Sequence, residues 1–408
     1  MCIRDSCGYP GTPGSGFGIL TGQGNGQGGR EHGQKADQLP GYRSISDPVA
    51  RRAVAGVWRV SPDSLPGPGK SAYELLQSCG TEGGVRALFV MGFNALVSSP
   101  AANEVETRLA SLDFLAVSDF FLSETAKMAD VVLPSAQWAE EDGTMTNLEG
   151  RVIRRKRAVV APIGVASDIG VLVGLAERLG KRKHFVYNTP EDVFNELARA
   201  TKGAPADYSG ITYAKIEAQR GVFWPCPSAE HTGTPRLFLD TFATPSGRAR
   251  FHPVKHRLPA ETPDKDYPLF LTTGRVLAQY QSGTMTRRVP ALNAMSGTAV
   301  AELHPQTAAR LKVTDGGPMS VRTRRGSVDV TAKVTRDIRP DTVFMPFHWP
   351  GEQSANRLTI GALDPTSRMP EFKVCAARVD PVSKDSARPF GSKDLSPALR
   401  DLSKDTRS

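Results

Sequence analysis

The chain has 408 residues and a formal net charge of +9, with 39% hydrophobic and 23% charged residues. This composition is typical of globular proteins, and the length allows two or three domains. No apolar run is long enough to cross a bilayer, and no nucleic-acid-binding module is visible. We therefore expect neither a membrane nor a nucleic acid as a partner. The basic residues are dispersed, apart from the run at residues 154–157.

Glycine dominates the first segment, residues 8–43, in which residues 21–30 read Thr-Gly-Gln-Gly-Asn-Gly-Gln-Gly-Gly-Arg. Such a run can let the backbone lie close to a flat or charged ligand, or it can be a flexible linker. The interleaved glutamine, asparagine and arginine favour a loop that lines a ligand.

The cysteines are sparse: Cys2, Cys7, Cys79, Cys226 and Cys375. None forms a CxxC pair, so the residues indicate neither a zinc nor an iron–sulfur site. Sparse, odd-numbered cysteines favour a reducing compartment, and we expect a cytoplasmic protein. No signal peptide is visible, and the first six residues enter the glycine-rich segment without a strand. We expect the natural N-terminus to lie further upstream.

Hydrophobic patterning predicts a parallel α/β unit in the first half of the chain. The expected elements are a helix at 71–78, strands at 85–91, 114–117 and 130–133, and intervening helices at 104–112 and 124–128. Ligands of parallel sheets bind beyond the carboxyl ends of the strands. Three polar clusters fall there: Gly92 with Asn94, Ser118 with Asp119, and a polar loop at 140–151. Asp119 can accept from a ribose or base, or it can be a helix N-cap or a turn residue.

The loop at 140–151 carries donors suited to phosphates or a nucleobase: Gly143, Thr144, Asn147 and Arg151. The alternative is an ordinary loop of turn residues.

The pattern changes from helices to strands at Leu269. Helices are expected at 168–179 and 191–199, followed by an irregular stretch at 202–265 with a hairpin at 244–253. Short strands with tight turns then predict a closed barrel. These elements are strands at 269–272, 299–303, 319–323, 327–334 and 342–347, with a helix at 307–311.

Several of these segments carry a family pattern, in order along residues 8–380. The matching segments are Gly22-Gln23 with its glycine run, Gly92-x-Asn94, 124–126, 129–134, Gly143-Thr144, 147–151, 272–275, 347–349, 356–359, 363–365 and 370–373. The ordered set resembles the molybdopterin-guanine-dinucleotide oxidoreductases, the group that contains nitrate reductases and formate dehydrogenases.

The resemblance implies an α/β plus β fold. Residues 1–180 would form part of a parallel α/β dinucleotide-binding domain, and 181–265 an irregular connection. Residues 266–382 would form a six-stranded, double-psi-type β-barrel that covers the cofactor, and 383–408 a disordered tail.

The implied cofactor is a bis-molybdopterin guanine dinucleotide with molybdenum. The candidate residues for binding it are Gly92, Asn94, Ser118, Asp119, Gly143, Thr144, Asn147, Arg151, Thr273, Gly274, Arg275, Arg287, Arg288, Asn356 and Lys373. The alternatives are surface ion pairs for the arginines and a turn amide for Asn356.

The family's first segment has no counterpart in this sequence. It normally carries the cysteines of a [4Fe–4S] cluster and the residue that ligates molybdenum. The resemblance therefore places the cluster and the catalytic ligand upstream, assigns none of the five cysteines, and implies that this stretch alone is inactive.

The glycine run and residues 274–288 look most like assimilatory nitrate reductases, which reduce nitrate by two electrons. Formate dehydrogenases of the family carry an arginine where Thr21 stands, placed to hold a carboxylate. Thr21, Gly22 and Gln23 are the candidates for the substrate channel. The electron donor would be a ferredoxin, a flavodoxin or an NADH-linked flavoprotein. The alternatives are a formate dehydrogenase and a non-catalytic cofactor-binding fragment.

Overall fold

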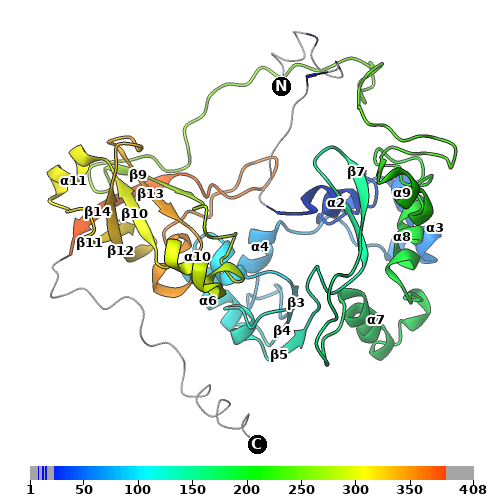
Figure 1. Ribbon diagram of the computed structural model, residues 1–408, viewed down its shortest axis with the longest axis horizontal. Helices are drawn as coiled ribbons and strands as arrows, with labels where there is room; N and C mark the ends of the chain where they lie inside the picture. The colour runs from blue at the N-terminus through cyan, green and yellow to red at the C-terminus, as the bar shows by residue number, and fades with distance from the viewer. Residues whose placement is uncertain (1–7, 9–11, 13, 16–22, 383–408) are drawn as a thin grey trace, which may run out of the picture. The chain divides into compact units, whose positions relative to one another are not determined.

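The computed structural model describes residues 8, 12, 14, 15 and 23–382 (Figure 1). Thr21, Gly22 and the expected tail at 383–408 lie outside the described residues. The chain divides into two compact units. Unit 1 comprises Met1–Ala95 and Glu104–Arg257, and unit 2 comprises Leu96–Asn103 and Leu258–Ser408. The divide therefore falls near the expected start of the barrel, and each unit is described by itself.

A parallel sheet lies in unit 1, as predicted. Its strands in the described chain are β3 (Ala87–Met91), β4 (Phe114–Asp119) and β5 (Val131–Pro134), in the order β3-β4-β5. The connections carry α5 (Ala95–Ser98), α6 (Ala102–Ala110) and the 3-10 turn η2 (Ala126–Met128). Val90, Leu115 and Val117 form its core. Parallel pairing brings the carboxyl ends of the strands to one edge.

The prediction of a polar loop at 140–151 is wrong, because most of this segment belongs to a β-hairpin. Strand β6 (Gly143–Thr146) pairs antiparallel with β7 (Arg151–Arg155), and β7 pairs with β8 (Val222–Phe223). The tight turn at 147–150 ends in Gly150 at φ +83°. Polar threonines on β6 concealed the strand, since threonine favours strands as well as loops.

The glycine run also contains a short helix where a loop was predicted, α2 (Gly26–Glu31). The other helices described in unit 1 are α3 (Pro48–Trp58), α4 (Ala72–Gln77), α7 (Asp168–Arg178), α8 (Pro190–Ala200) and α9 (Tyr213–Gln219). Two short strands, β1 (Gln38–Leu39) and β2 (Arg43–Ser44), pair antiparallel. The predicted helices at 71–78, 168–179 and 191–199 are confirmed.

A second core in unit 1 explains why residues 202–226 are more ordered than their composition predicts. Buried Tyr208, Ile211 and Ile216 pack with Phe194 of α8 and Val222 of β8. Helix α9 therefore lies inside the stretch predicted as irregular. The hairpin predicted at 244–253 is absent from the described residues, which form turns there. Pro245 and Pro253 lack the N–H groups that a hairpin ladder needs.

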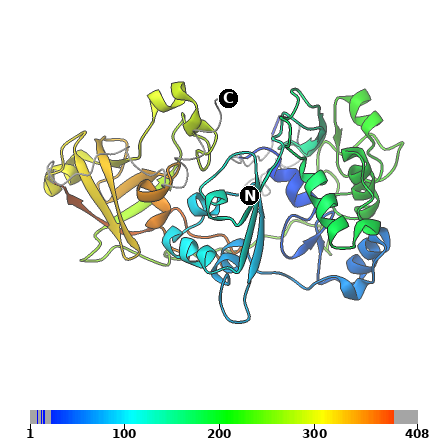
Figure 2. The same cartoon turned by 90° about the horizontal axis from the view of Figure 1, so that it is seen from below.

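Unit 2 contains a closed barrel, as predicted (Figure 2). In the described residues its strands run in the order β10-β12-β11-β14-β9-β13, with both parallel and antiparallel pairs. Their bounds are β9 (Leu269–Gly274), β10 (Val300–Leu303), β11 (Pro318–Thr323), β12 (Gly326–Val334), β13 (Thr342–Pro346) and β14 (Cys375–Pro381). Helices α10 (Pro290–Met295) and α11 (Pro305–Leu311) accompany them.

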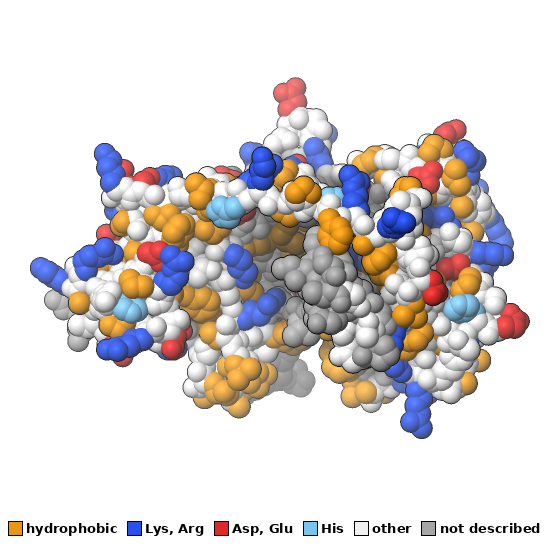
Figure 3. Space-filling model, turned by 90° about the horizontal axis from the view of Figure 1, so that it is seen from above, with side chains coloured by type: hydrophobic (Ala, Val, Ile, Leu, Met, Phe, Trp, Pro, Cys, Tyr) orange, Lys and Arg blue, Asp and Glu red, His pale blue; other side chains and the backbone are white. Residues whose placement is uncertain are grey.

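Every second side chain along the barrel strands points into the barrel core. On β12, Val328, Val330 and Ala332 point inward while intervening residues face outward. Sequence patterning missed β14, whose Ala376 and Ala377 are small and buried and give little strand signal. Figure 3 shows Lys and Arg side chains spread over the visible face, which fits the dispersed charge of the sequence.

Candidate functional site

The carboxyl edge of the parallel sheet brings together Gly92 and Ser118. Gly92 has φ +58° and donates its N–H to the Ser118 carbonyl oxygen at 2.8 Å. A side chain on Gly92 would meet no heavy atom within 4 Å, so this backbone faces open space. The Ser118 hydroxyl is buried and has no hydrogen-bond partner in the described structure. A backbone turn and an unsatisfied hydroxyl therefore lie together at this edge.

Asn94 is tied into the protein. Its Nδ2 donates to Glu124 Oε2 at 2.6 Å, and its Oδ1 accepts from the Thr125 hydroxyl at 3.0 Å. The side chain is buried. Asn94 thus joins the loop after β3 to the loop after β4, and we infer that it shapes the edge rather than offering a free amide to a ligand.

Asp119 acts as a turn residue, one of the alternatives that the sequence left open, and the N-cap of η2 is Thr125. Its Oδ1 accepts from the Phe120 N–H at 2.8 Å, and its Oδ2 accepts from the Ser123 hydroxyl at 2.8 Å. Both carboxylate oxygens therefore have local donors. Each oxygen keeps further lone pairs that a ribose or base donor can use.

Two candidates on the hairpin hold its turn. Asn147 Oδ1 accepts from the N–H groups of Glu149 and Arg151 at 3.0 and 3.1 Å. The Arg151 guanidinium lies 4.5 Å from the centroid of the Phe223 ring and 3.4 Å from Glu149. These contacts fix the turn, and the half-buried arginine stays within reach of an anion.

A cavity of about 860 Å³ opens beside the hairpin. Gly143 and Thr144 line it, together with Glu141, Asp168 and His32. Burial raises the pKa of Glu141, with the Asp168 charge adding to the rise. Burial lowers the pKa of His32 to about 4, so its imidazole is neutral at pH 7. The cavity combines backbone donors, protonatable acids and a neutral imidazole.

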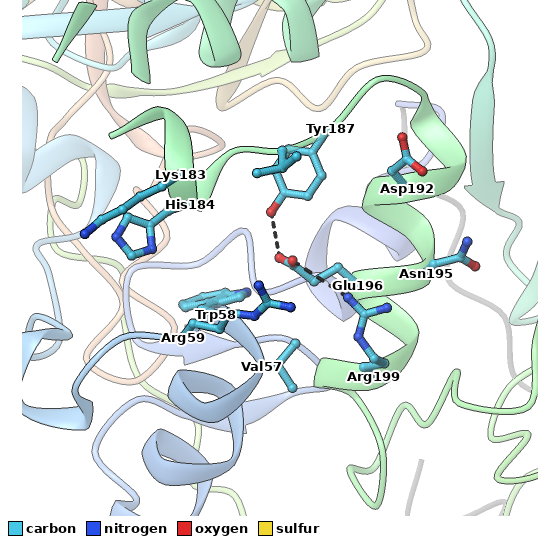
Figure 4. Close-up of a pocket in the computed structure, with 11 residues that line it drawn as sticks. Val57, Trp58, Arg59, Lys183, His184, Tyr187, Asp192, Asn195, Glu196 and Arg199 are labelled. Carbon is cyan, nitrogen blue, oxygen red and sulfur yellow. Dashed lines mark hydrogen bonds and ion pairs between the residues drawn. The ribbon is translucent and has the colours of Figure 1, made fainter. Parts of the chain in front are cut away.

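A smaller cleft of about 310 Å³ shares Trp58, His184 and Tyr187 with that cavity (Figure 4). In Figure 4 Tyr187 points toward Glu196 of α8, and its hydroxyl donates to that carboxylate at 2.7 Å. Arg199 lies 3.9 Å from the same carboxylate. The Glu196 carboxylate is therefore already bonded, and Asp192, the other acid of the cleft, accepts from the N–H groups of Asn188 and Thr189.

Unit 2 gathers its candidates at the end of β9. Lys373 Nζ donates to the Thr273 carbonyl oxygen at 2.9 Å, and the Thr273 hydroxyl donates to the Phe372 carbonyl oxygen at 2.7 Å. Lys373 and Arg275 lie 5.0 and 5.7 Å from the centroid of the Phe347 ring. Partial burial and the Arg275 charge lower the pKa of Lys373. Neither cation has an ion pair among the described residues.

His348 orders this end of the barrel and was not among the predicted site residues. Its Nε2 accepts from the Val276 N–H at 3.0 Å, and its Nδ1 lies 2.6 Å from the Gln281 carbonyl oxygen. Both bonds form only in the neutral tautomer that carries the proton on Nδ1. Burial lowers its pKa, and the charges of Arg275 and Lys373 lower it further. The family segment at 347–349 was its only signal in the sequence.

The remaining candidates differ in position. Arg288 donates to the Thr284 carbonyl oxygen, and Arg287 to that of Ser282 at 3.5 Å. Asn356 is buried and donates to the Val97 carbonyl oxygen at 2.6 Å. Gly274 packs so closely that a Cβ there would lie 2.5 Å from the Phe344 ring. Gln23 is exposed.

Polar groups lie at the edge of the parallel sheet, and cations without acidic partners among the described residues lie at the end of a barrel strand. Such groups suit an anionic ligand. Residues 2–178 match the "Molybdopterin oxidoreductase" family, and residues 269–376 match the "Molydopterin dinucleotide binding domain". The chain belongs to the molybdopterin oxidoreductase family.

Curated relatives support this assignment. The assimilatory nitrate reductase catalytic subunit of Bacillus subtilis is 47% identical over 374 residues, which cover 91% of this chain and 52% of the relative. The F420-dependent formate dehydrogenase subunit alpha of Methanocaldococcus jannaschii is 42% identical over 370 residues, covering 91% and 53%. The chain thus spans about half the length of these relatives.

Among solved structures, acetylene hydratase from Pelobacter acetylenicus has the same fold. Its TM-score is 0.61 at 20% identity, covering 82% of this chain and 50% of that one. No helix in the described part of the chain is long and apolar enough to span a membrane.

The residues present fit a molybdopterin dinucleotide. The unsatisfied Ser118 hydroxyl and the open backbone at Gly92 suit a polar, phosphate-bearing ligand. Arg275 and Lys373 offer positive charge that no described acid neutralises. These donors and cations are of the kinds that an anionic dinucleotide requires.

Proposed function

We propose that this chain is the cofactor-holding part of a molybdenum-dependent nitrate reductase catalytic subunit. The observation that carries the proposal is the 47% identity to the assimilatory enzyme of B. subtilis over 91% of the chain. The reaction converts nitrate, two protons and two electrons into nitrite and water. The electrons would come from a ferredoxin, a flavodoxin or an NADH-linked flavoprotein, through a [4Fe–4S] cluster. We place the protein in the cytoplasm, where free cysteines such as Cys79 and Cys226 persist.

In this proposal the residues of the chain bind and orient a bis-molybdopterin guanine dinucleotide. When bound, the molybdenum centre supplies the two-electron redox chemistry. Gly92, Ser118 and Asp119 would meet the phosphate and sugar of one dinucleotide, and the hairpin residues Gly143 and Thr144 would approach it. Asn94 would hold the loops that carry these groups.

The barrel residues would hold the pterin side. Lys373 and Arg275 would neutralise phosphate or pterin oxygens, while Phe347 supplies an apolar floor beneath both cations. His348 would hold the segment that follows β9, which begins with Arg275, through its bonds to Val276 and Gln281. Arg287 and Arg288 would contribute further positive charge toward nitrate or the cofactor.

A second candidate is a formate dehydrogenase, which the 42% identity to the M. jannaschii enzyme favours. Thr21 bears on the choice, because a buried carboxylate such as formate is held best by a charged partner. Losing that partner removes about 1.5–3 kcal/mol of binding. A neutral threonine is more compatible with nitrate.

Steady-state assays of the holoenzyme from molybdate-supplied cells distinguish the two. We expect nitrite formation with reduced methyl viologen and no formate oxidation. Thr21→Arg should lower nitrate turnover, while Arg310→Ala on the exposed face of α11 should not. Formate oxidation without nitrate reduction would replace the first candidate by the second.

A further inference from the structure

Glu31, the last residue of α2, is completely buried and joins two distant segments. Its Oε2 is hydrogen-bonded to the Thr146 hydroxyl at 2.9 Å and to the Tyr208 hydroxyl. The Thr146 and Tyr208 hydroxyl oxygens are themselves 3.0 Å apart. Three oxygen atoms therefore form a closed triangle in which each oxygen contacts the other two.

The number of protons available to this triangle favours a neutral Glu31. Each hydroxyl supplies one proton, so Thr146 and Tyr208 can fill only two of the three edges. A proton on Glu31 Oε2 is the third, and with it all three edges can be hydrogen bonds. When Glu31 is neutral, its Oε2 accepts a hydrogen bond from one hydroxyl and donates one to the other. The two hydroxyls then share the remaining hydrogen bond, so each of the three contacts contains a proton.

The surroundings agree with a neutral acid. Among the described residues Glu31 has no ion pair, and its other oxygen, Oε1, has no hydrogen-bond partner. An ionised carboxylate would leave negative charge on that buried, unbonded oxygen, which is far less favourable than a neutral carbonyl oxygen. Burial raises the pKa of Glu31, and the nearby Tyr208, Gln27, Thr146 and Trp224 side chains oppose part of that rise. The Trp224 indole N–H makes no hydrogen bond within the described structure, and the Gln27 amide donates to the Tyr42 hydroxyl.

The titratable groups that face Glu31 add no compensating charge. Tyr208 and Tyr42 both have pKa values raised by burial and by Glu31 itself, so both are neutral. His32 next to Glu31 is neutral, because burial lowers its pKa to about 4. Arg30 donates to the Gln27 side chain at 3.3 Å instead.

The triangle lies where α2 packs against β6. A Cβ on Gly28 would be 3.3 Å from the Thr146 hydroxyl, so glycine lets the helix lie against the strand. Asn25 adds a second tie, because its Oδ1 accepts from the Thr146 N–H at 2.9 Å. Thr146 belongs to the strand that carries Gly143 and Thr144.

We propose that Glu31 is a positioning residue that acts as a buried, neutral carboxylic acid and ties the glycine run to the cofactor hairpin through Thr146. Its importance for the cofactor rests on the proposed function, whereas its charge state does not. Deprotonation removes the proton of one edge and places a charge among neutral neighbours. The hairpin therefore loosens from α2 as the pH rises through the pKa of Glu31.

Two measurements on the whole chain test this without nitrate or formate. Infrared difference spectra should show a protonated carboxyl band at pH 7 that is absent from Glu31→Gln. Hydrogen exchange should show the amides of β6 losing protection with rising pH, by up to about tenfold per pH unit once Glu31 titrates. The Glu31→Gln chain should lack that loss, and Glu31→Ala should have low protection at every pH.

The control variant is Glu177→Gln, which removes an exposed carboxylate of α7 and should leave both signals unchanged. The proposal would be overturned if the wild-type chain showed no carboxyl band at pH 7 and the β6 amides lost protection as the pH was lowered. That result would mean that Glu31 is ionised. Cofactor content then separates the two proposals. Less molybdopterin in Glu31→Ala than in Glu31→Gln supports the positioning role. No molybdopterin in any variant would contradict the proposed function and leave the infrared result standing.

Discussion

Lys373 and Thr273 meet at the end of strand β9, where the Lys373 Nζ lies 2.9 Å from the Thr273 carbonyl oxygen. They are 100 residues apart in the sequence. Closure of the barrel explains the contact, because β14, which follows Lys373, pairs with β9, which ends just after Thr273. Two separate segments of the family pattern thus become one cationic site.

Replacing Lys373 by alanine should weaken cofactor retention by about 10- to 100-fold. This corresponds to the roughly 1.5–3 kcal/mol of a hydrogen bond to a charged group. The measurement is the guanine nucleotide retained by the holoenzyme after dialysis. Arg310→Ala removes an exposed cation from α11 in the same unit and should retain the cofactor fully. Equal retention in both variants would exclude Lys373 as a ligand.

Ser118→Ala should separate folding from binding. The hydroxyl is buried without a partner, so its removal should leave the apoprotein as stable as the wild type or up to about 1 kcal/mol more stable. The same variant should hold the dinucleotide less tightly. Urea unfolding of apoprotein and holoenzyme provides both values. Destabilised apoprotein would show that the hydroxyl already has a structural role.

Asn94→Ala should destabilise unit 1 by about 1–3 kcal/mol, because Glu124 and Thr125 lose buried hydrogen bonds. Urea unfolding followed by near-ultraviolet circular dichroism measures the change. Asn195→Ala on the exposed face of α8 is the matched control and should stay within about 0.5 kcal/mol. Wild-type stability of Asn94→Ala would mean that the tie contributes little.

His348 should make stability fall in acid. Its pKa is lowered in the folded chain, so below about pH 6.5 the unfolded chain binds a proton that the folded chain refuses. Stability therefore decreases as the pH falls from about 6.5 toward the folded pKa. His348→Gln should flatten this slope, and His256→Gln at an exposed position should keep it. An unchanged slope in His348→Gln would assign the acid sensitivity to other groups.

Patterns of burial made the parallel sheet and most of the barrel predictable. Val90, Val117 and Val330 belong to apolar runs or alternating segments whose period identifies a strand. The hairpin at 143–155 escaped prediction because Thr144 and Asn147 read equally well as loop residues. Strand β14 escaped because Ala376 and Ala377 carry almost no strand propensity.

The chemistry of individual site residues was less predictable. Asn94 and Asn356 were predicted as ligands from the family pattern, and the fold gives both of them protein partners. Glu31 and His348 were not predicted, since their importance comes from tertiary contacts with Thr146, Tyr208 and Gln281. Residue type indicates what a side chain can bond, and only the fold decides which partner it receives.

The most direct test of the central claim is the composition of the purified holoenzyme from molybdate-supplied cells. Acid oxidation releases fluorescent pterin and guanine nucleotide, which are quantified against molybdenum by plasma mass spectrometry. The account predicts two guanine nucleotides and two pterins for each molybdenum. Purified protein without measurable molybdenum and pterin would contradict the account.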